Sequence, residues 1–306
     1  MKIILAKNSG FCFGVKKAVD LAFEHAGRDT YTYGEIIHNE AVTGKLAGLG
    51  VRDYGKWEMR EGDGNAVLPS EVEGDHGKNS KSKVIIRSHG VGRDVYDKLV
   101  AEGFEVLDAT CPFVKKIHEI VAEHYAKGYH IVIIGRRDHP EVIGINGWCD
   151  GKATVIEDEE QVSKADCFAN ARNDGIKLCV VCQTTFLTQK YLAIIQKIKK
   201  HAGNSLEIFD TICYTTSVRQ EETQELAKKC TVMLVVGSKS SSNTSKLLGI
   251  CAEHCERAYL IDGVDKLRDI KFDKSDTVGI VGGASAEEEL IQEVYGFVTR
   301  LTKNIK

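Results

Sequence analysis

The chain of 306 residues is 42% hydrophobic and 28% charged, with a formal net charge of −3 at pH 7. These values are typical of a soluble globular protein with room for two or three domains. A charge this close to neutral gives no bulk electrostatic reason to expect nucleic acid or a membrane as a partner. No apolar run approaches the roughly 20 residues of a transmembrane helix. Residues 1–7 look like a first strand rather than a signal peptide, which predicts a cytoplasmic protein.

Short apolar runs alternate with amphipathic stretches along most of the chain. After the opening strand, we predict further strands at 84–86, 131–134, 178–181, 232–236 and 278–281. Runs of this kind suit strands that are buried on both faces of a parallel sheet. We predict helices between them at 114–127, 190–201 and 218–229. This alternation indicates an α/β fold built from right-handed crossover units.

One segment interrupts the alternation. Residues 54–83 are rich in Gly, Glu, Asp, Lys and Ser. We interpret this segment as a long, partly mobile surface loop, whose composition gives little reason to expect a functional role.

Three cysteines occur in similar surroundings at nearly equal intervals. Cys12, Cys111 and Cys213 each follow a strand-like segment, and a helical pattern begins directly after each of them. The regular spacing predicts three similar α/β domains around an approximate threefold axis, with three thiolates at the centre. We place these domains at 13–110, 111–212 and 213–306, and assign residues 1–12 to an N-terminal strand that carries the first cysteine.

The remaining cysteines do not form a second site of this kind. Cys179 and Cys182 have a C-x-x-C spacing but lie in an apolar strand, where their side chains point to opposite faces. Cys251 and Cys255 share one helical face, the spacing of half a zinc site, but no second pair is evident. We therefore interpret these as packed residues. The same holds for Cys149, Cys167 and Cys230.

Short polar turns, which we call polar corners, follow the predicted strands. They contain His38, His89, His139, Ser241, Ser242, Asn243 and Ser285. Backbone N–H groups at the start of a helix favour anions, and Ser, Asn and His side chains add donors, so these corners suit a phosphate or diphosphate. For the serine and asparagine run alone, helix capping is the more common role. The recurrence of such corners at strand ends favours a binding site.

Two further side chains suit proton transfer. Glu141 follows His139 and Pro140, and an acid in a cleft beside a metal cofactor is a natural proton donor, although most glutamates are simply solvated. Thr184 occupies a similar position after the next strand, where its hydroxyl can relay a proton or cap a helix. Three thiolates without a fourth suit a 4Fe–4S cluster in which one iron lacks a protein ligand.

Nine motifs together carry a resemblance to a known family. They are GFCFGV at 10–15, GEIIHN at 34–39, SHGV at 88–91, DATCP at 108–112, HPEV at 139–142, QTT at 183–185, DTIC at 210–213, SSNT at 241–244 and GASA at 283–286. In content and order this set closely resembles the 4-hydroxy-3-methylbut-2-enyl diphosphate reductases of the non-mevalonate isoprenoid pathway. The resemblance spans almost the whole chain.

The resemblance implies a role for each matched residue. Cys12, Cys111 and Cys213 match the ligands of the 4Fe–4S cluster, Glu141 matches the proton-delivering acid, and Thr184 matches the hydroxyl beside the substrate. The diphosphate-binding set corresponds to His38, His89, His139, Ser241, Ser242, Asn243 and Ser285. The implied fold is trefoil-like, with three α/β domains around a central cluster.

The implied reaction removes the allylic hydroxyl of the substrate reductively. It takes place at the open iron, consumes two electrons and two protons, and gives isopentenyl and dimethylallyl diphosphates. The implied electron donor is reduced ferredoxin or flavodoxin. Two other readings remain at this point. A zinc-dependent hydrolase predicts a colourless, zinc-loaded protein, and a non-catalytic iron–sulfur sensor predicts that Glu141→Gln behaves like the wild type.

Overall fold

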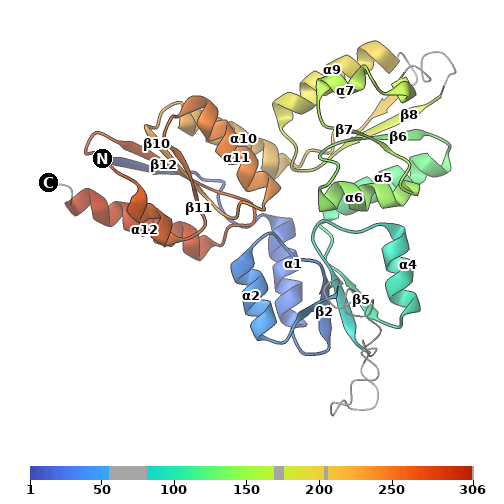
Figure 1. The fold of residues 1–306 in the computed structure, drawn as a ribbon, viewed down its shortest axis with the longest axis horizontal. Helices are drawn as coiled ribbons and strands as arrows, with labels where there is room; N and C mark the ends of the chain where they lie inside the picture. The colour runs from blue at the N-terminus through green and yellow to red at the C-terminus, as the bar shows by residue number, and fades with distance from the viewer. Residues whose placement is uncertain (55–80, 169–175, 203–205, 305–306) are drawn as a thin grey trace.

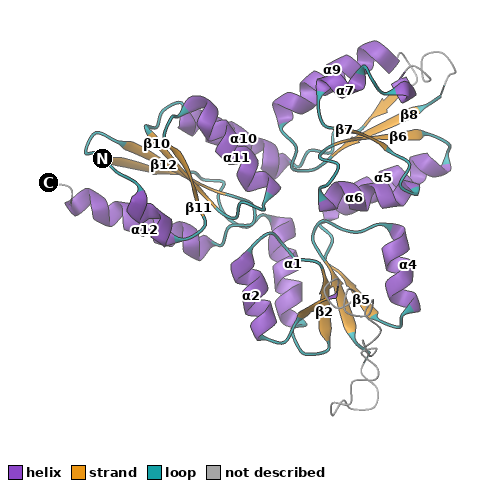
Figure 2. Ribbon diagram, in the orientation of Figure 1, coloured by secondary structure: helices purple, strands orange, loops and turns teal. Residues whose placement is uncertain are grey.

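The computed structural model describes residues 1–54, 81–168, 176–202 and 206–304. Of the predicted surface loop at 54–83, residues 55–80 lie outside these ranges. The described chain forms three lobes that meet at a common centre (Figure 1). Each lobe contains one four-stranded parallel sheet, and helices lie on both sides of each sheet (Figure 2). The predicted arrangement of three similar α/β domains is confirmed.

The predicted strands and helices are present, with ends that differ by a few residues. The strands are β1 (Lys2–Leu5), β2 (Thr30–Tyr33), β3 (Arg52–Asp53), β4 (Lys83–Ile86), β5 (Glu105–Asp108), β6 (His130–Ile134), β7 (Thr154–Ile156), β8 (Leu178–Cys182), β9 (Leu206–Ile208), β10 (Val232–Val236), β11 (Ala258–Ile261) and β12 (Thr277–Gly282). The helices are α1 (Phe13–Glu24), α2 (Glu40–Gly48), α4 (Arg93–Ala101), α5 (Pro112–Ala126), α6 (Pro140–Asn146), α7 (Glu159–Val162), α9 (Thr188–Ala202), α10 (Tyr214–Ala227), α11 (Ser242–His254) and α12 (Glu288–Asn304), with 3-10 turns at Gly147–Cys149 and Val264–Asp269.

All three sheets have the same strand order. The orders are β3-β2-β4-β5, β7-β6-β8-β9 and, read in the same direction, β11-β10-β12-β1. The third sheet is therefore completed by the N-terminal strand, which takes the position of β5 and β9. Its register with β12 runs from Lys2 opposite Thr277 to Leu5 opposite Ile280. As a result, each of the three cysteines follows the fourth strand of one sheet and precedes the first helix of the next lobe.

The sheets are buried on both faces, as the apolar runs predicted. In β8, Cys179 packs in a cluster with Ile131 and Val181, whereas Cys182 packs in a different cluster with Val132 and the helix α9. The prediction that these two thiols point to opposite faces is confirmed. All ten cysteines are free thiols. Of the helices described, none is both long and apolar enough to cross a membrane.

Candidate active site

A single cavity opens where the three lobes meet. Its walls include every side chain that the sequence predicted for the site: Cys12, His38, His89, Cys111, His139, Glu141, Thr184, Cys213, Ser241, Ser242, Asn243 and Ser285. The empty space of the cavity, with its opening to solvent, is about 760 Å³.

The cavity lies at the switch points of the three sheets. In each sheet the order of the strands along the chain reverses between the two central strands. These central pairs are β2 with β4, β6 with β8, and β10 with β12. Ligands of open α/β sheets bind beyond the carboxyl ends of such strands. The segments after these six strands carry the polar side chains of the site, and the segments after the fourth strands carry the cysteines. The repeated topology thus brings distant parts of the chain to one point.

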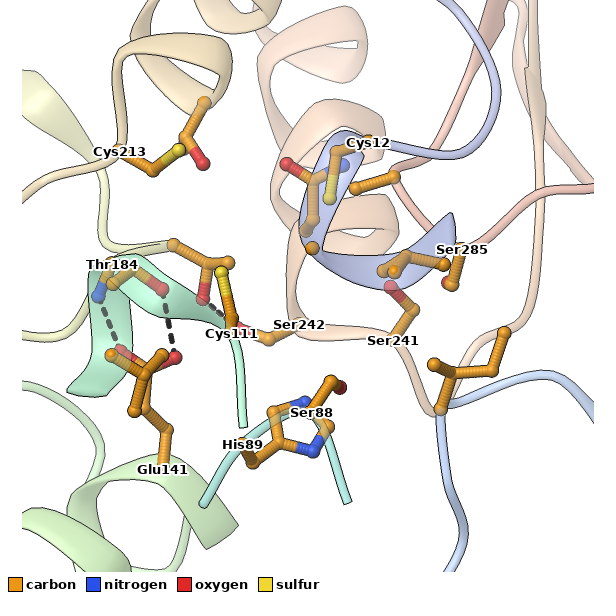
Figure 3. A pocket seen from close by; sticks show the side chains of 18 of the residues that line it. Cys12, Ser88, His89, Cys111, Glu141, Thr184, Cys213, Ser241, Ser242 and Ser285 are labelled. Carbon is orange, nitrogen blue, oxygen red and sulfur yellow. Dashed lines mark hydrogen bonds between the residues drawn. The ribbon is translucent and has the colours of Figure 1, made fainter. Parts of the chain in front are cut away.

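The three cysteines occupy equivalent positions at the starts of helices. Cys12, Cys111 and Cys213 are the N-cap residues of α1, α5 and α10, and none of their side chains caps its helix. Figure 3 shows their side chains pointing into the same space. The positive end of a helix stabilises a thiolate or an anionic group placed there. Burial raises the pKa of Cys111 to about 11, so a metal group bound here displaces a proton from this thiol.

Gly14 makes room for the second of these thiols. It lies in the first turn of α1, and a Cβ atom at this position would stand 2.4 Å from the Sγ atom of Cys111. No side chain fits at that distance, so glycine is required for α1 to approach Cys111. Gly14, the second glycine of the GFCFGV motif, is therefore explained by this close packing.

Glu141 and Thr184 form a hydrogen-bonded pair, which we call the acid pair. The backbone N–H of Thr184 donates to Oε1 of Glu141 at 2.6 Å, and the hydroxyl of Thr184 lies 2.8 Å from Oε2 (Figure 3). Glu141 is only 1% exposed. Burial raises the pKa of its carboxyl, although the hydrogen bonds from Thr184 and the charge of Lys246 oppose this shift. A carboxylic acid with a raised pKa beside a hydroxyl can donate a proton through that hydroxyl.

Three histidines converge beside the acid pair. The ring centroids of His38 and His89 lie 4.7 Å apart, and those of His89 and His139 lie 5.4 Å apart. Burial lowers the pKa of all three, to about 3 for His139, and the charge of Arg87 lowers each of them further, while Glu35 opposes the shift for His38. The rings are therefore neutral near pH 7 in the absence of a ligand.

The tautomer of His139 follows from its place in the fold. His139 is the N-cap of α6, in the extended conformation that Pro140 predicted, and its Nδ1 accepts a hydrogen bond from the backbone N–H of Glu141 at 3.1 Å. The proton must then be on Nε2. This Nε2 atom is buried and has no partner within the described chain. It is a donor available to a bound anion.

The histidines and the cysteines differ in the size of the group they can hold. Among the described residues, His38, His89 and His139 are the only set of three or more His, Cys, Asp or Glu side chains with ligand atoms all within 4.8 Å of one another. The three cysteine sulfurs are thus too far apart to share a single ion. The space between them suits a larger group.

The serine and asparagine run caps a helix and also lines the cavity. Ser241 is the N-cap of α11, and its side chain accepts from the N–H of Thr244 at 3.4 Å, so the capping prediction is confirmed. The same residue also lines the cavity. The Nδ2 atom of Asn243 and the Oγ atom of Ser285 are buried without a partner among the described residues. Together with the three histidines they form what we call the anion corner.

Sequence reasoning missed one partly buried cation beside the cavity. The Nζ atom of Lys246 donates to the carbonyl of Thr185 at 2.6 Å and to the hydroxyl of Ser242 at 2.9 Å. Burial lowers the pKa of this amine to about 8, while the charge of Glu141 opposes the shift. The only signal in the sequence was its position four residues after Ser242, which places both on one face of α11.

The fold and the cavity define an α/β enzyme class with three parallel sheets and one central site that can hold a metal group and an anion. The LytB protein family model matches residues 3–299. The chain belongs to this family and is an oxidoreductase.

Relatives of similar length support the assignment. The chain is 41% identical over 298 residues to a protein of Caldanaerobacter subterraneus subsp. tengcongensis, covering 96% of this chain and 95% of the relative. It is 39% identical over 306 residues to one of Alkaliphilus oremlandii, covering 98% of this chain and all of the relative (100%). Both relatives are named 4-hydroxy-3-methylbut-2-enyl diphosphate reductase.

Two solved structures are similar in fold. One is described as the (E)-4-hydroxy-3-methyl-but-2-enyl diphosphate reductase, the terminal enzyme of the non-mevalonate pathway. It has a TM-score of 0.63 and 32% identity, over 98% of this chain and 100% of that one. The other is a reductase from Plasmodium falciparum with a TM-score of 0.80 and 26% identity, over 100% of this chain and 90% of that one.

Proposed function

We propose that the protein reduces 4-hydroxy-3-methylbut-2-enyl diphosphate to isopentenyl and dimethylallyl diphosphates. One observation carries the proposal: three thiols, a buried acid paired with a hydroxyl, and unpaired anion-binding donors line one cavity. In the reaction the C–O bond of the allylic alcohol breaks, two electrons and two protons are taken up, and water leaves. The names of the relatives support this substrate.

The donor set fits a 4Fe–4S cluster held by Cys12, Cys111 and Cys213. Three thiols at helix N-termini point into a space too wide for one ion, and Gly14 keeps that space open. When bound, such a cluster supplies electrons one at a time and an iron without a protein ligand. Because the three sulfurs are too far apart to share one ion, they do not suit the single zinc ion of a zinc-dependent hydrolase.

The side chains around the thiols have separate tasks in this reaction. The anion corner binds and orients the diphosphate, with Nε2–H of His139, the amide of Asn243 and the hydroxyl of Ser285 as donors. Binding at this remote group fixes the position of the reacting hydroxyl. Glu141 supplies a proton through the Thr184 hydroxyl to the departing oxygen. The raised pKa of Glu141 keeps this proton available.

Electrons come, in this proposal, from reduced ferredoxin or flavodoxin in the cytoplasm. The residues that directly follow two of the cysteines support access for a protein donor. Phe13 is 68% exposed and Tyr214 is 79% exposed, next to Cys12 and Cys213. Exposed aromatic side chains are common at protein–protein contacts.

Anaerobic purification with iron and sulfide analysis, followed by substrate addition under a reductant, tests the proposal. We expect a brown protein with about four irons per chain that consumes the allylic diphosphate and releases both products. A colourless protein loaded with zinc would contradict it and favour the hydrolase. A brown protein that binds but never consumes the substrate would favour the sensor.

A further inference from the structure

Arg219 is a buried arginine that no step of the proposed reaction uses. It lies on α10, six residues after Cys213, and is only 4% exposed. Its Nη1 donates to the carbonyl of Gly282 at 3.0 Å, and its Nη2 donates to the carbonyl of Gly10 at 2.5 Å. Gly282 ends β12, and Gly10 lies two residues before Cys12. One guanidinium thus joins the helix of Cys213 to the segment that carries Cys12.

The third side of this guanidinium has no protein partner. Its Nε–H is buried and makes no hydrogen bond to any part of the chain that the structure describes. The two groups that Arg219 does bind are neutral carbonyls. Burial lowers its pKa, and the charges that act against this shift are, in order, those of Cys12, Cys213 and Glu222. A buried cation without a bonded anion is costly, so a nearby negative charge is needed to offset it.

Glu222 does not provide a direct partner for this side chain. It lies one turn after Arg219 on α10, and its carboxylate accepts hydrogen bonds from the backbone N–H of Lys7 at 2.7 Å and of Asn8 at 3.0 Å. Glu222 and Arg219 therefore hold the same segment before Cys12, but with opposite charges. The remaining source of negative charge beside Arg219 is the thiolate form that Cys12 and Cys213 take when they hold a metal group.

We propose that Arg219 is a positioning residue that stabilises the negative charge of the iron–sulfur group held by Cys12 and Cys213, and so raises its reduction potential. This inference rests on the cluster of the proposed function. Reduction adds one negative charge to the group, and a fixed buried cation stabilises the reduced form more than the oxidised form. Charge and hydrogen bonds around the sulfurs are established determinants of cluster potentials.

A redox titration of the substrate-free cluster, followed by electron paramagnetic resonance, tests this. We expect Arg219→Gln and Arg219→Met to shift the ratio of reduced to oxidised cluster about tenfold towards the oxidised form, or about 59 mV for a one-electron couple. Arg219→Lys keeps the charge but not the forked contacts to both carbonyls. We expect its potential to stay close to that of the wild type.

Two matched controls separate charge from loop anchoring. Glu222→Gln weakens the hydrogen bonds that hold Lys7 and Asn8, in the segment before Cys12, but it removes a negative charge. The reduction potential of the cluster in this variant should therefore stay the same or rise. Lys228→Met removes a cation from the exposed end of the same helix, about 14 Å further along its axis, and should leave the potential unchanged. A fall in Glu222→Gln equal to that in Arg219→Gln would overturn the proposal in favour of a purely structural anchor.

An unchanged potential in a neutral Arg219 variant that keeps its cluster also overturns it. If both neutral variants lose the cluster, reconstitution decides: a stable cluster in Arg219→Lys supports the role of charge, and loss in all three variants contradicts it. Failure of the proposed function gives a different result, because the wild type would then carry no cluster or would not consume the substrate.

Discussion

The acid pair and the anion corner of one cavity differ in how completely their polar groups are satisfied. Both carboxylate oxygens of Glu141 are bonded to Thr184. In the anion corner, by contrast, donors on His139, Asn243 and Ser285 are buried without partners among the described residues. An unsatisfied buried donor costs about 1–3 kcal/mol. The acid pair is therefore complete before substrate arrives, whereas the anion corner is completed by the ligand.

Within the proposed function, this difference places proton delivery and binding in separate groups. A preorganised pair acts on the transition state without rearranging, while unpaired donors convert their desolvation cost into affinity for an anion. Variants of the two regions should accordingly affect different kinetic constants.

Removing any one of the three cysteine thiols that line the cavity should abolish the site itself. We expect Cys12→Ser, Cys111→Ser and Cys213→Ser each to lose the iron–sulfur group and nearly all turnover, because all three sulfurs face the same space. Cys179→Ser and Cys255→Ser serve as controls, since these buried thiols pack in cores away from the cavity. Iron and sulfide analysis measures the result. A full cluster with turnover in any of the first three variants would remove that cysteine from the ligand set.

Neutralising the acid should affect turnover alone. Glu141→Gln preserves the size of the side chain but cannot deliver the proton, so we expect kcat to fall by on the order of 10² to 10⁴. The cluster content and the affinity for substrate should remain. Single-turnover kinetics with matched binding measurements distinguish the two effects. Turnover at the wild-type rate would exclude Glu141 from proton delivery.

Removing one donor from the anion corner should affect binding instead. His139→Asn keeps a good N-cap for α6 but removes the Nε2–H donor. A hydrogen bond to a charged group is worth about 1.5–3 kcal/mol, so we expect affinity to fall roughly 10- to 100-fold. Cluster content should not change. A fall in kcat with unchanged KM would contradict the separation of roles.

The histidines should also take up protons when an anion binds. Their pKa values are lowered in the ligand-free protein, and a bound diphosphate raises them. Affinity should therefore increase as the pH falls, since the bound form holds more protons. Calorimetry with inorganic diphosphate in buffers of different ionisation enthalpy counts these protons. The protons should go to His38 and His89, because Nδ1 of His139 already accepts from the backbone N–H of Glu141. The uptake should therefore be smaller in His89→Asn than in the wild type, and equal uptake in both proteins would exclude His89 as a site of protonation.

Lys246 links the two regions, and its removal should give the smallest effect. The positive charge of Lys246 lowers the pKa of Glu141, so Lys246→Met should raise that pKa. The alkaline limb of the kcat profile, where Glu141 loses its proton, should then move to higher pH. Lys246→Arg keeps the charge and should restore the wild-type profile. A shift to lower pH in the methionine variant would contradict the electrostatic link.

Much of the fold was predictable because it depends on local patterns. Apolar runs such as 232–236 and 278–281 became the buried central strands β10 and β12. The convergence of Cys12, Cys111 and Cys213 was predictable from their regular spacing and their places before helices.

Other features depend on contacts that no local pattern encodes. The pairing of β1 with β12 joins positions 2 and 277, and nothing near residue 2 indicates which sheet it enters. The hydrogen bonds of Glu141 with Thr184 depend on how the first turn of α6 approaches the loop after β8. Arg219 and Lys246 lie within helices. The sequence around a buried or partly buried cation in a helix looks the same as the sequence around an exposed one.

The completion of the third sheet by β1 has a consequence for biosynthesis. The strand β1 pairs with β12, whose residues follow it by more than 270 positions, as in the pairing of Lys2 with Thr277, so its partner is synthesised long after β1 itself. Closing so long a loop makes this pairing a late event in folding. Cys12, which follows β1, is therefore held in its place beside the other two thiols only after β12 has been made.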